Sequence, residues 1–309
     1  MSQEWAVVVP VGPGELEASR LADLFDSLST YEPDVGRVVV VDDGPELGRD
    51  LLALAGDLAT RTRVVVQPKL EYSGDAARRA RRAWSDGVLR ATLCGFRAAL
   101  EDPSVGWVMR LDTDSLVIGP FAERVAAGLG ADVGIVGTLE RFPDGSPRDM
   151  SGWGKAIKKF CMPISPWRVP RLMVRSSLVG RGRERCLLIR AARRNGYEWG
   201  EHCQGGGFAI SRAAIQRIGD AGWLDERLWS GAGIGEDVVV SLLVRAVGLG
   251  ARGMVDPGEP FAVQHVGLPG TPEDLVAAGY GIAHSVKDSE AASEDEIRDR
   301  FRTLRLANR

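Results

Sequence analysis

The triplet Asp112-Thr113-Asp114 has the residue types and spacing best suited to chemistry in this sequence. It follows an apolar segment, residues 107–111, so two carboxylates one residue apart are expected at the end of a strand. Mg²⁺ and Mn²⁺ take oxygen ligands, often use only one or two carboxylates, and complete their shell with phosphate oxygens and water. One interpretation is therefore a divalent metal that shares a diphosphate, and the other is a turn after a strand.

Two further acidic pairs stand next to apolar segments. Asp42-Asp43 follows residues 38–41, and Glu236-Asp237 precedes an aliphatic run over residues 238–247. Acids in the first turn of a helix stabilise the positive end of its dipole, which is one explanation of the second pair. The aliphatic run would also anchor the pair rigidly against a sheet, as a catalytic base requires.

Alternating strands and helices would position these acids. Apolar runs predict strands, and residues with helical periodicity predict the helices between them. The expected strands are residues 5–11, 37–41, 63–66, 107–111 and 205–211, and the expected helices are residues 15–28, 47–58, 87–100, 212–218 and 236–247. This alternation predicts an α/β fold with a mainly parallel sheet flanked by helices. Ligands in such sheets gather at the carboxyl ends of the strands, where Asp42-Asp43 and Asp112 to Asp114 fall.

The alternation stops in the middle of the chain. Residues 148–194 contain thirteen Lys and Arg but only two acids, Asp149 and Glu184. Apolar residues such as Trp153 and Trp167 are interleaved with basic ones such as Lys158 and Arg168. This composition suits a lobe that meets an anionic acceptor or an anionic lipid surface, and it also suits an ordinary packed subdomain. The expected divisions of the chain are residues 1–140, 141–204, 205–288 and a charged helical tail, 289–309.

Composition excludes several classes of protein. A chain of 309 residues with 44% hydrophobic and 26% charged residues can bury the core of a globular enzyme. Its net charge of -3 gives no global attraction to nucleic acid. Four cysteines without CxxC spacing favour neither a zinc knuckle nor a disulfide framework. No apolar run approaches the roughly 20 residues of a spanning helix, so we expect a cytoplasmic protein with at most peripheral membrane contact.

Three segments together resemble the inverting GT-A glycosyltransferases, in particular the large family 2-like group of bacterial nucleotide-sugar transferases. They are Val38-Val-Val-Val-Asp-Asp-Gly44, Arg110-Leu-Asp-Thr-Asp-Ser115 and Gly235-Glu-Asp-Val-Val-Val-Ser-Leu-Leu-Val-Arg245. The resemblance covers residues 5–137 and 205–248. It implies a Rossmann-like GT-A fold, a nucleotide-sugar donor and Mn²⁺ or Mg²⁺ as cofactor.

The resemblance also implies roles for individual residues. Asp114 would bind the metal, Asp112 the metal or ribose, and Asp237 would be the catalytic base with Glu236 beside it. The nucleotide-sugar would be bound by residues of the first half, together with a lysine near the end of the chain: Pro10, Val11, Asp42, Asp43, Asp112, Thr113 and Lys287. Gly205, Gly206 and Gly207 look like the glycine-rich strand of the acceptor side. Residues 1–140 would then be the donor half, 141–204 an acceptor-side insertion, and 205–288 the acceptor and catalytic half.

Histidine offers two further candidates for the metal. In many metal-dependent members of the fold a late His completes the site, and Gly281-Ile-Ala-His-Ser-Val-Lys287 looks like that element. His284 is the first choice, and Lys287 would meet a phosphate. His265 is the rival, and His202 is expected to be structural or on the acceptor side.

These inferences predict a hexosyltransferase-type enzyme that moves a sugar from a UDP- or TDP-type donor to an unidentified acceptor by inverting displacement. One alternative is a sugar-1-phosphate nucleotidyltransferase, although Val11-Gly-Pro-Gly14 matches its phosphate loop poorly. The other is a non-catalytic module that binds anions or lipid, which would leave Asp112, Asp114 and Asp237 without a purpose.

Overall fold

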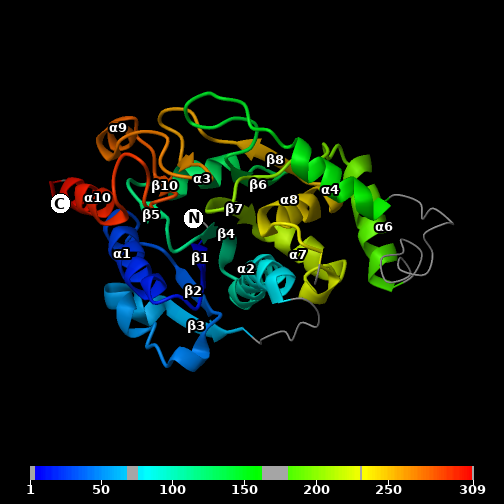
Figure 1. Ribbon diagram of the computed structural model, residues 1–309, viewed down its shortest axis with the longest axis horizontal. Coiled ribbons are helices and arrows are strands. Elements are labelled where there is room, and N and C mark those ends of the chain that lie inside the picture. Colours follow the sequence, from blue (N-terminus) through cyan, green and yellow to red (C-terminus); the bar gives the residue numbers. More distant parts are fainter. Residues whose placement is uncertain (1–3, 68–75, 162–179, 230–231, 308–309) are drawn as a thin grey trace.

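A seven-stranded sheet forms the centre of the molecule in the computed structural model, which describes residues 4–67, 76–161, 180–229 and 232–307 (Figure 1). Its strand order is β3-β2-β1-β4-β7-β6-β8. The strands are β1 (Glu4–Val11), β2 (Arg37–Asp42), β3 (Thr62–Val66), β4 (Val105–Leu111), β6 (Val133–Gly137), β7 (Gly207–Ser211) and β8 (Gly250–Gly253). All pairs are parallel except those of β7, which runs antiparallel to both β4 and β6. The predicted α/β fold with a mainly parallel sheet is confirmed.

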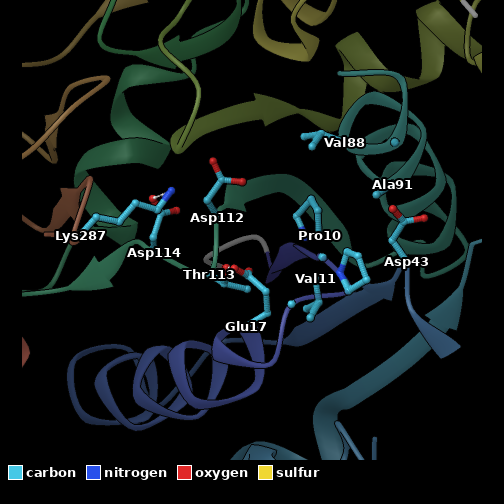
Figure 2. A pocket seen from close by; sticks show the side chains of 14 residues that line it. Pro10, Val11, Glu17, Asp43, Val88, Ala91, Asp112, Thr113, Asp114 and Lys287 are labelled. Atoms are coloured by element: carbon cyan, nitrogen blue, oxygen red, sulfur yellow. Dashed lines mark hydrogen bonds and ion pairs between the residues drawn. The ribbon is translucent and has the colours of Figure 1, made fainter. Parts of the chain in front are cut away.

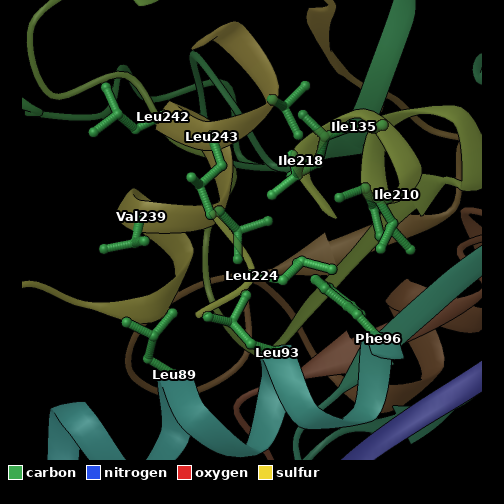
Figure 3. Close-up of a cluster of buried hydrophobic side chains, with 14 of the residues drawn as sticks. Leu89, Leu93, Phe96, Ile135, Ile210, Ile218, Leu224, Val239, Leu242 and Leu243 are labelled. Atoms are coloured by element: carbon green, nitrogen blue, oxygen red, sulfur yellow. The ribbon is translucent and has the colours of Figure 1, made fainter. Parts of the chain in front are cut away.

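Helices cover both faces of this sheet. The described helices are α1 (Leu16–Tyr31), α2 (Ala76–Leu100), α3 (Ala122–Gly128), α4 (Ser151–Cys161), α6 (Gly180–Arg194), α7 (Arg212–Asp220), α8 (Glu236–Ala246), α9 (Pro272–Ala277) and α10 (Glu294–Ala307). Helices α1 and α3 pack on one face of this sheet and α2, α7 and α8 on the other, whereas α9 and α10 pack against the smaller sheet described below. Side chains alternate across a strand, so Val8 of β1 joins the core cluster with α2, α7 and α8, whereas Val7 and Val9 join the cluster with α1. Figure 3 shows the first cluster, where α2 and α8 bring their leucines together over the sheet. The sheet is thereby fixed between two apolar layers.

The leucines of residues 47–58 do not form the single helix that their spacing predicts. The chain instead forms two 3₁₀ segments, η1 (Pro45–Leu47) and η2 (Ala53–Arg61). Gly48 and Gly56 both have positive φ, 61° and 50°, which interrupts a right-handed helix. Leu58 is buried, but Leu47 is exposed, so the leucine pattern reflects separate contacts rather than one helical face.

A second, three-stranded sheet joins distant parts of the chain. Its order is β5 (Leu116–Val117), β10 (Ile282–His284) and β9 (Phe261–Val263). Ala283 pairs with Leu116 in antiparallel register. Because β5 begins two residues after Asp114 and β10 ends at His284, this pairing brings two predicted metal ligands together.

Helices α4 and α6 lie at the edge of the molecule, beside α8 (Figure 1). Phe160 of α4 packs edge-on against Trp229, with ring centroids 6.4 Å apart. Trp167 and Arg168 of the predicted basic insertion lie outside the described residues. Strands from the predicted donor half and catalytic half share one sheet, and the division at residues 140, 204 and 288 stays a prediction.

Within the described residues, no helix combines the length and apolar character needed to cross a bilayer. The four cysteines, all described, are free thiols.

Candidate active site

The loop after β4 is held against the start of β7 by hydrogen bonds. The Asp112 amide donates to the Gly206 carbonyl over 3.1 Å, and the Ser115 hydroxyl donates to the same carbonyl over 2.6 Å. The Ser115 amide closes the turn on the Asp112 carbonyl at 3.1 Å. Both carboxylates of the triplet therefore have fixed positions, Asp112 partly exposed and Asp114 buried.

Three side chains converge on the buried carboxylate of Asp114. Its Oδ2 lies 3.3 Å from His284 Nε2 and 2.7 Å from Lys287 Nζ, and it accepts a hydrogen bond from Ser285 Oγ at 3.0 Å. Burial by itself raises the pKa of Asp114, but the hydrogen bonds and positive charges of His284 and Lys287 outweigh burial and hold that pKa well below its usual range. Burial likewise opposes a charged His284, yet Asp114 and Asp112 raise its pKa above the ordinary value.

Asp112, Asp114 and His284 can each offer one ligand atom to a metal, and these atoms lie within 4.8 Å of one another. His284 Nδ1 is 2.8 Å from the Gln264 carbonyl. That carbonyl can only accept, so Nδ1 carries a proton, and Nε2 is the nitrogen that faces the two carboxylates and would offer its lone pair to a bound metal. Two carboxylates and one imidazole suit Mn²⁺ or Mg²⁺ and leave room for phosphate oxygens and water. The residues present fit a divalent cation.

Gly206 permits this arrangement. Its φ is +99°, and a β-carbon at this position would overlap the imidazole ring of His284. Gly205 lies instead beside the other acidic pair, because its β-carbon would come within 3.1 Å of Glu236 Oε1. Gly207 is buried at the start of β7, where its β-carbon would meet Val263 and Ile282. The three glycines expected on the acceptor side thus have three different neighbours.

His265, the rival metal candidate, lies on an exposed loop after β9 and is not among the three ligands that gather.

A pocket of about 250 Å³ opens beside the cluster, at the carboxyl ends of β1, β2 and β4 (Figure 2). It contains six of the seven residues predicted to bind the nucleotide-sugar: Pro10, Val11, Asp43, Asp112, Thr113 and Lys287. The seventh, Asp42, points elsewhere, since its Oδ1 accepts from the Gly44 amide at 2.9 Å and pairs with Arg49 Nη2 at 2.8 Å. Asp42 therefore shapes the turn that presents Asp43.

Sequence reasoning missed Glu17, which also lines this pocket and accepts a hydrogen bond from the Thr113 hydroxyl. Glu17 lies in the first turn of α1, where an acid is common, so its position in the sequence did not distinguish it.

Sequence reasoning also missed Arg110, which connects the candidate metal ligands to the second acidic pair. This fully buried guanidinium places Nη2 2.7 Å from Asp112 Oδ1 and 3.2 Å from Glu236 Oε1. With the described part of the chain, none of its nitrogens makes a well-directed hydrogen bond, so these contacts are chiefly electrostatic. Burial opposes its charge, but Asp112 and Glu236 raise the pKa of Arg110. The available signal was a charge within the apolar run of β4.

Glu236 and Asp237 are both buried at the start of α8, but their surroundings differ. Burial raises the pKa of Glu236 to about 7, an effect that Arg110 reduces and the neighbouring Asp237 and Asp112 increase. Asp237 Oδ1 accepts from the Val238 amide at 2.8 Å, and Oδ2 accepts from the Gly205 amide at 3.1 Å. These two amides fix the orientation of the Asp237 carboxylate.

No family model and no curated protein matches the sequence. Among solved structures, the fold is similar to the apo form of the bifunctional glycosyltransferase WbbM, with 13% identity, a TM-score of 0.50, and coverage of 99% of this chain and 50% of that one. It is also similar to the galactosyltransferase LgtC in complex with donor and acceptor sugar analogues, with 13% identity, a TM-score of 0.46, and coverage of 98% and 95%. A third is the Mn/GDP form of core-mannan synthase A from Aspergillus fumigatus, with 11% identity, a TM-score of 0.46, and coverage of 89% and 82%.

This chain spans half the length of the WbbM chain, and at such identities the similarity concerns the fold. The expected GT-A-type fold is confirmed.

Proposed function

We propose that this protein is a metal-dependent glycosyltransferase that uses a nucleotide-sugar donor. The observation that carries the proposal is the cluster of Asp112, Asp114 and His284, which opens onto a pocket at the carboxyl ends of the strands. A parallel sheet binds ligands at this edge, and hard cations with few carboxylate ligands commonly share a diphosphate.

The donor would lie along the pocket with its diphosphate at the cluster. Lys287 Nζ, half-exposed beside Asp114, is available to contact a phosphate oxygen. The nucleoside would extend past Pro10 and Val11 toward Asp43, at the other end of the pocket (Figure 2). UDP- and TDP-sugars are the donors we favour, by analogy with the family that the sequence resembles.

The reaction we propose is an inverting single displacement. Asp237 removes the proton of an acceptor hydroxyl, the acceptor oxygen forms a bond to the anomeric carbon, and the bond from that carbon to the diphosphate breaks. When bound, the metal would offset the charge that develops on the departing nucleoside diphosphate. The Arg110 guanidinium contacts the carboxylates of both Asp112 and Glu236 and so links the proposed donor side to the proposed acceptor side.

The acceptor would approach from the side of α4. Trp153 of α4 lies against Gly235, which immediately precedes the acidic pair, and the exposed residues Lys155, Lys158 and Lys159 lie on the same helix. This position and charge support an anionic or lipid-linked acceptor, with at most peripheral contact to a membrane.

Calorimetry with UDP in the presence and absence of Mn²⁺ tests the proposal. Wild-type protein should bind UDP more tightly with Mn²⁺, and Asp114→Asn should lose most of that enhancement because the amide cannot replace the buried anionic ligand. Asp34→Asn changes an exposed aspartate far from the pocket residues and serves as the control. Equal Mn²⁺ dependence in Asp114→Asn would refute the metal site, and a preference for a nucleoside triphosphate with a sugar phosphate would indicate a nucleotidyltransferase.

A further inference from the structure

A buried polar network lies behind Asp237 and centres on His202. The imidazole is almost fully buried, with Nδ1 2.7 Å from the Gly200 carbonyl and Nε2 2.8 Å from Arg148 Nη2. Its Nε2 also lies 3.6 Å from Asp237 Oδ2. The imidazole thus stands between a guanidinium and the carboxylate that we propose as the base.

The hydrogen bonds define the protonation state of this histidine. A guanidinium can only donate, so Nε2 must accept from Arg148. A carbonyl can only accept, so Nδ1 must carry the proton that binds Gly200. His202 is therefore the neutral Nδ1–H tautomer, and its Nε2 has no proton to give to Asp237.

Two other charged groups next to His202, Glu201 and Arg148, also form hydrogen bonds with other parts of the chain. Glu201 Oε1 pairs with Arg245 of α8, at 2.9 Å to Nε and 2.5 Å to Nη2, and Oε2 accepts from the Glu198 amide at 2.9 Å. Arg148 donates to the carbonyls of Thr138, Leu139 and His202 and to Gln204 Oε1. Among the described residues, no ion pair joins Arg148 to a carboxylate.

Burial and the neighbouring charges both shift the pKa of the His202 imidazole, and the two carboxylates oppose burial and Arg148. Burial lowers the pKa of His202, Asp237 raises it, Arg148 lowers it and Glu201 raises it, and the net shift is downward. The nearby Cys203 thiol stays neutral, because burial raises its pKa to about 12.

We propose that Arg148 is a positioning residue that keeps His202 as the neutral Nδ1–H imidazole, so that Asp237 retains an unneutralised carboxylate for proton removal. The proposal rests on the assignment of Asp237 as the base. With Arg148 present, the positive charge of the network stays on the guanidinium, outside ion-pair distance of Asp237. Without it, Nε2 is free to bind a proton, form an ion pair with Asp237 Oδ2 and reduce the basicity of that carboxylate.

Nitrogen NMR of protein with ¹⁵N-labelled histidine tests the protonation state independently of catalysis. The sequence has only three histidines, and His202→Asn identifies the signal of His202. Wild-type His202 should be the Nδ1–H tautomer at pH 7, whereas Arg148→Met should let Nε2 gain a proton at a higher pH than in the wild type. An Nε2–H tautomer or an imidazolium in the wild type at pH 7 would overturn the proposal, even if the Arg148→Met protein did not fold.

Kinetics of the same variants test the consequence for Asp237. Arg148→Met should lower kcat about tenfold or more at pH 7 with little change in donor KM, because only the base is affected. The added substitution His202→Asn removes the imidazole atom that faces Asp237, retains a side-chain amide for the Gly200 carbonyl, and should restore most of kcat. Arg148→Lys keeps the charge and should lie between wild type and Arg148→Met.

The outcomes separate this inference from the proposed function. If the wild type transfers sugar but Arg148→Met/His202→Asn stays as slow as Arg148→Met, with matched melting temperatures, the positioning role is wrong. If no donor is used at all but His202 has the tautomer and the Arg148 dependence described, the proposed function fails while the electrostatic arrangement stands.

Discussion

Glu236 and Asp237 are adjacent acids with different environments. Glu236 lies against a single buried guanidinium, whereas two backbone amides orient Asp237 and a neutral imidazole lies behind it. Among the residues that the structure describes, no Lys or Arg forms an ion pair with Asp237, and such an oriented carboxylate is suited to accept a proton, so this contrast supports Asp237 as the base.

Asp237→Asn should therefore lower turnover by roughly 10²- to 10⁴-fold, the usual contribution of a general base, with little change in donor affinity. Steady-state kinetics and UDP calorimetry on the same preparations would measure both quantities. Asp220→Asn, at an exposed position on α7, is the control. Turnover within a few-fold of wild type would mean that another group removes the proton.

Glu236 gives a prediction about stability and pH. Its pKa is raised to about 7 in the folded protein, so between about pH 4.5 and 7 the folded state binds a proton that the unfolded state has lost. The contribution of Glu236 to the free energy of unfolding is therefore greatest at low pH and falls as pH rises through this range.

Urea denaturation of wild type and Glu236→Gln at pH 5 and pH 7.5 would measure this effect. The Gln side chain cannot ionise, so its stability relative to wild type should improve with pH, by on the order of 1–3 kcal/mol. Other titrating groups are common to both proteins and cancel in the comparison. A stability difference that does not depend on pH would contradict the raised pKa.

The sequence predicted the acids better than their partners. The spacing of Asp112 and Asp114 indicated a metal site, and family resemblance selected His284, which the structure brings beside them. Arg110 and Arg148 could not be found in this way, because their roles depend on which carboxylate or imidazole the fold places opposite each guanidinium.

At the level of elements, the strands of the first half were predictable because each is a short apolar run between turn signals. The direction of β7 was not, since apolar alternation looks the same in a parallel and an antiparallel strand. Its antiparallel pairing with β4 puts Gly207 opposite Leu111, so the chain around Gly205 and Gly206 meets the start of the Asp112 loop. Strand pairing, rather than local sequence, completes the site.

Close contact between α2 and β1 gives a prediction at this scale. A β-carbon on Gly95 would overlap the buried side chain of Val8, so Gly95→Ala must push the helix away from the strand. We expect a loss of about 1–3 kcal/mol in the free energy of unfolding, the usual cost of overpacking.

Gly152→Ala is the matched control, because a β-carbon there meets no atom of the described residues within 4 Å and the position lies in α4. Thermal and urea denaturation of both variants should show destabilisation only for Gly95→Ala. Equal stability of the two variants would mean that α2 adjusts without cost.

On the scale of the molecule, composition and the alternation of strands and helices predicted a sheet between two apolar layers. The structure has this arrangement (Figure 1). The role of residues 141–204 did not follow, because basic and aromatic residues serve equally in a packed subdomain and in a binding surface. In the structure some of these basic and aromatic residues form cation–π contacts with one another. Lys158 Nζ lies 5.2 Å from the centroid of the Trp199 ring, and Arg193 Cζ lies 5.1 Å from it.

Two of the three exposed lysines on α4, Lys155 and Lys159, test an anionic acceptor, whereas the third, Lys158, lies over the ring of Trp199. Replacing both with Gln should weaken acceptor use at low salt and have less effect at high salt, because exposed charges are screened beyond about 10 Å at 0.1 M salt. Donor hydrolysis should be spared. Initial rates at several salt concentrations would measure this, with Arg217→Gln/Arg252→Gln as a control that removes the same charge elsewhere.

Flotation with anionic liposomes would separate a lipid-linked acceptor from a soluble one. If the double lysine variant matched the control in both experiments, α4 would not recruit the acceptor.

The pairing of β5 with β10 also has a consequence for the order of protein synthesis. The ribosome makes Asp112 and Asp114 about 170 residues before His284, and both strands flanking β10 already exist by then. A nascent chain that stops before β10 would contain most of the residues that line the proposed nucleotide-sugar pocket but neither the His284 imidazole nor Lys287. Such a chain would lack one of the three residues proposed to bind the metal, so its affinity for Mn²⁺ should be lower than that of the full chain.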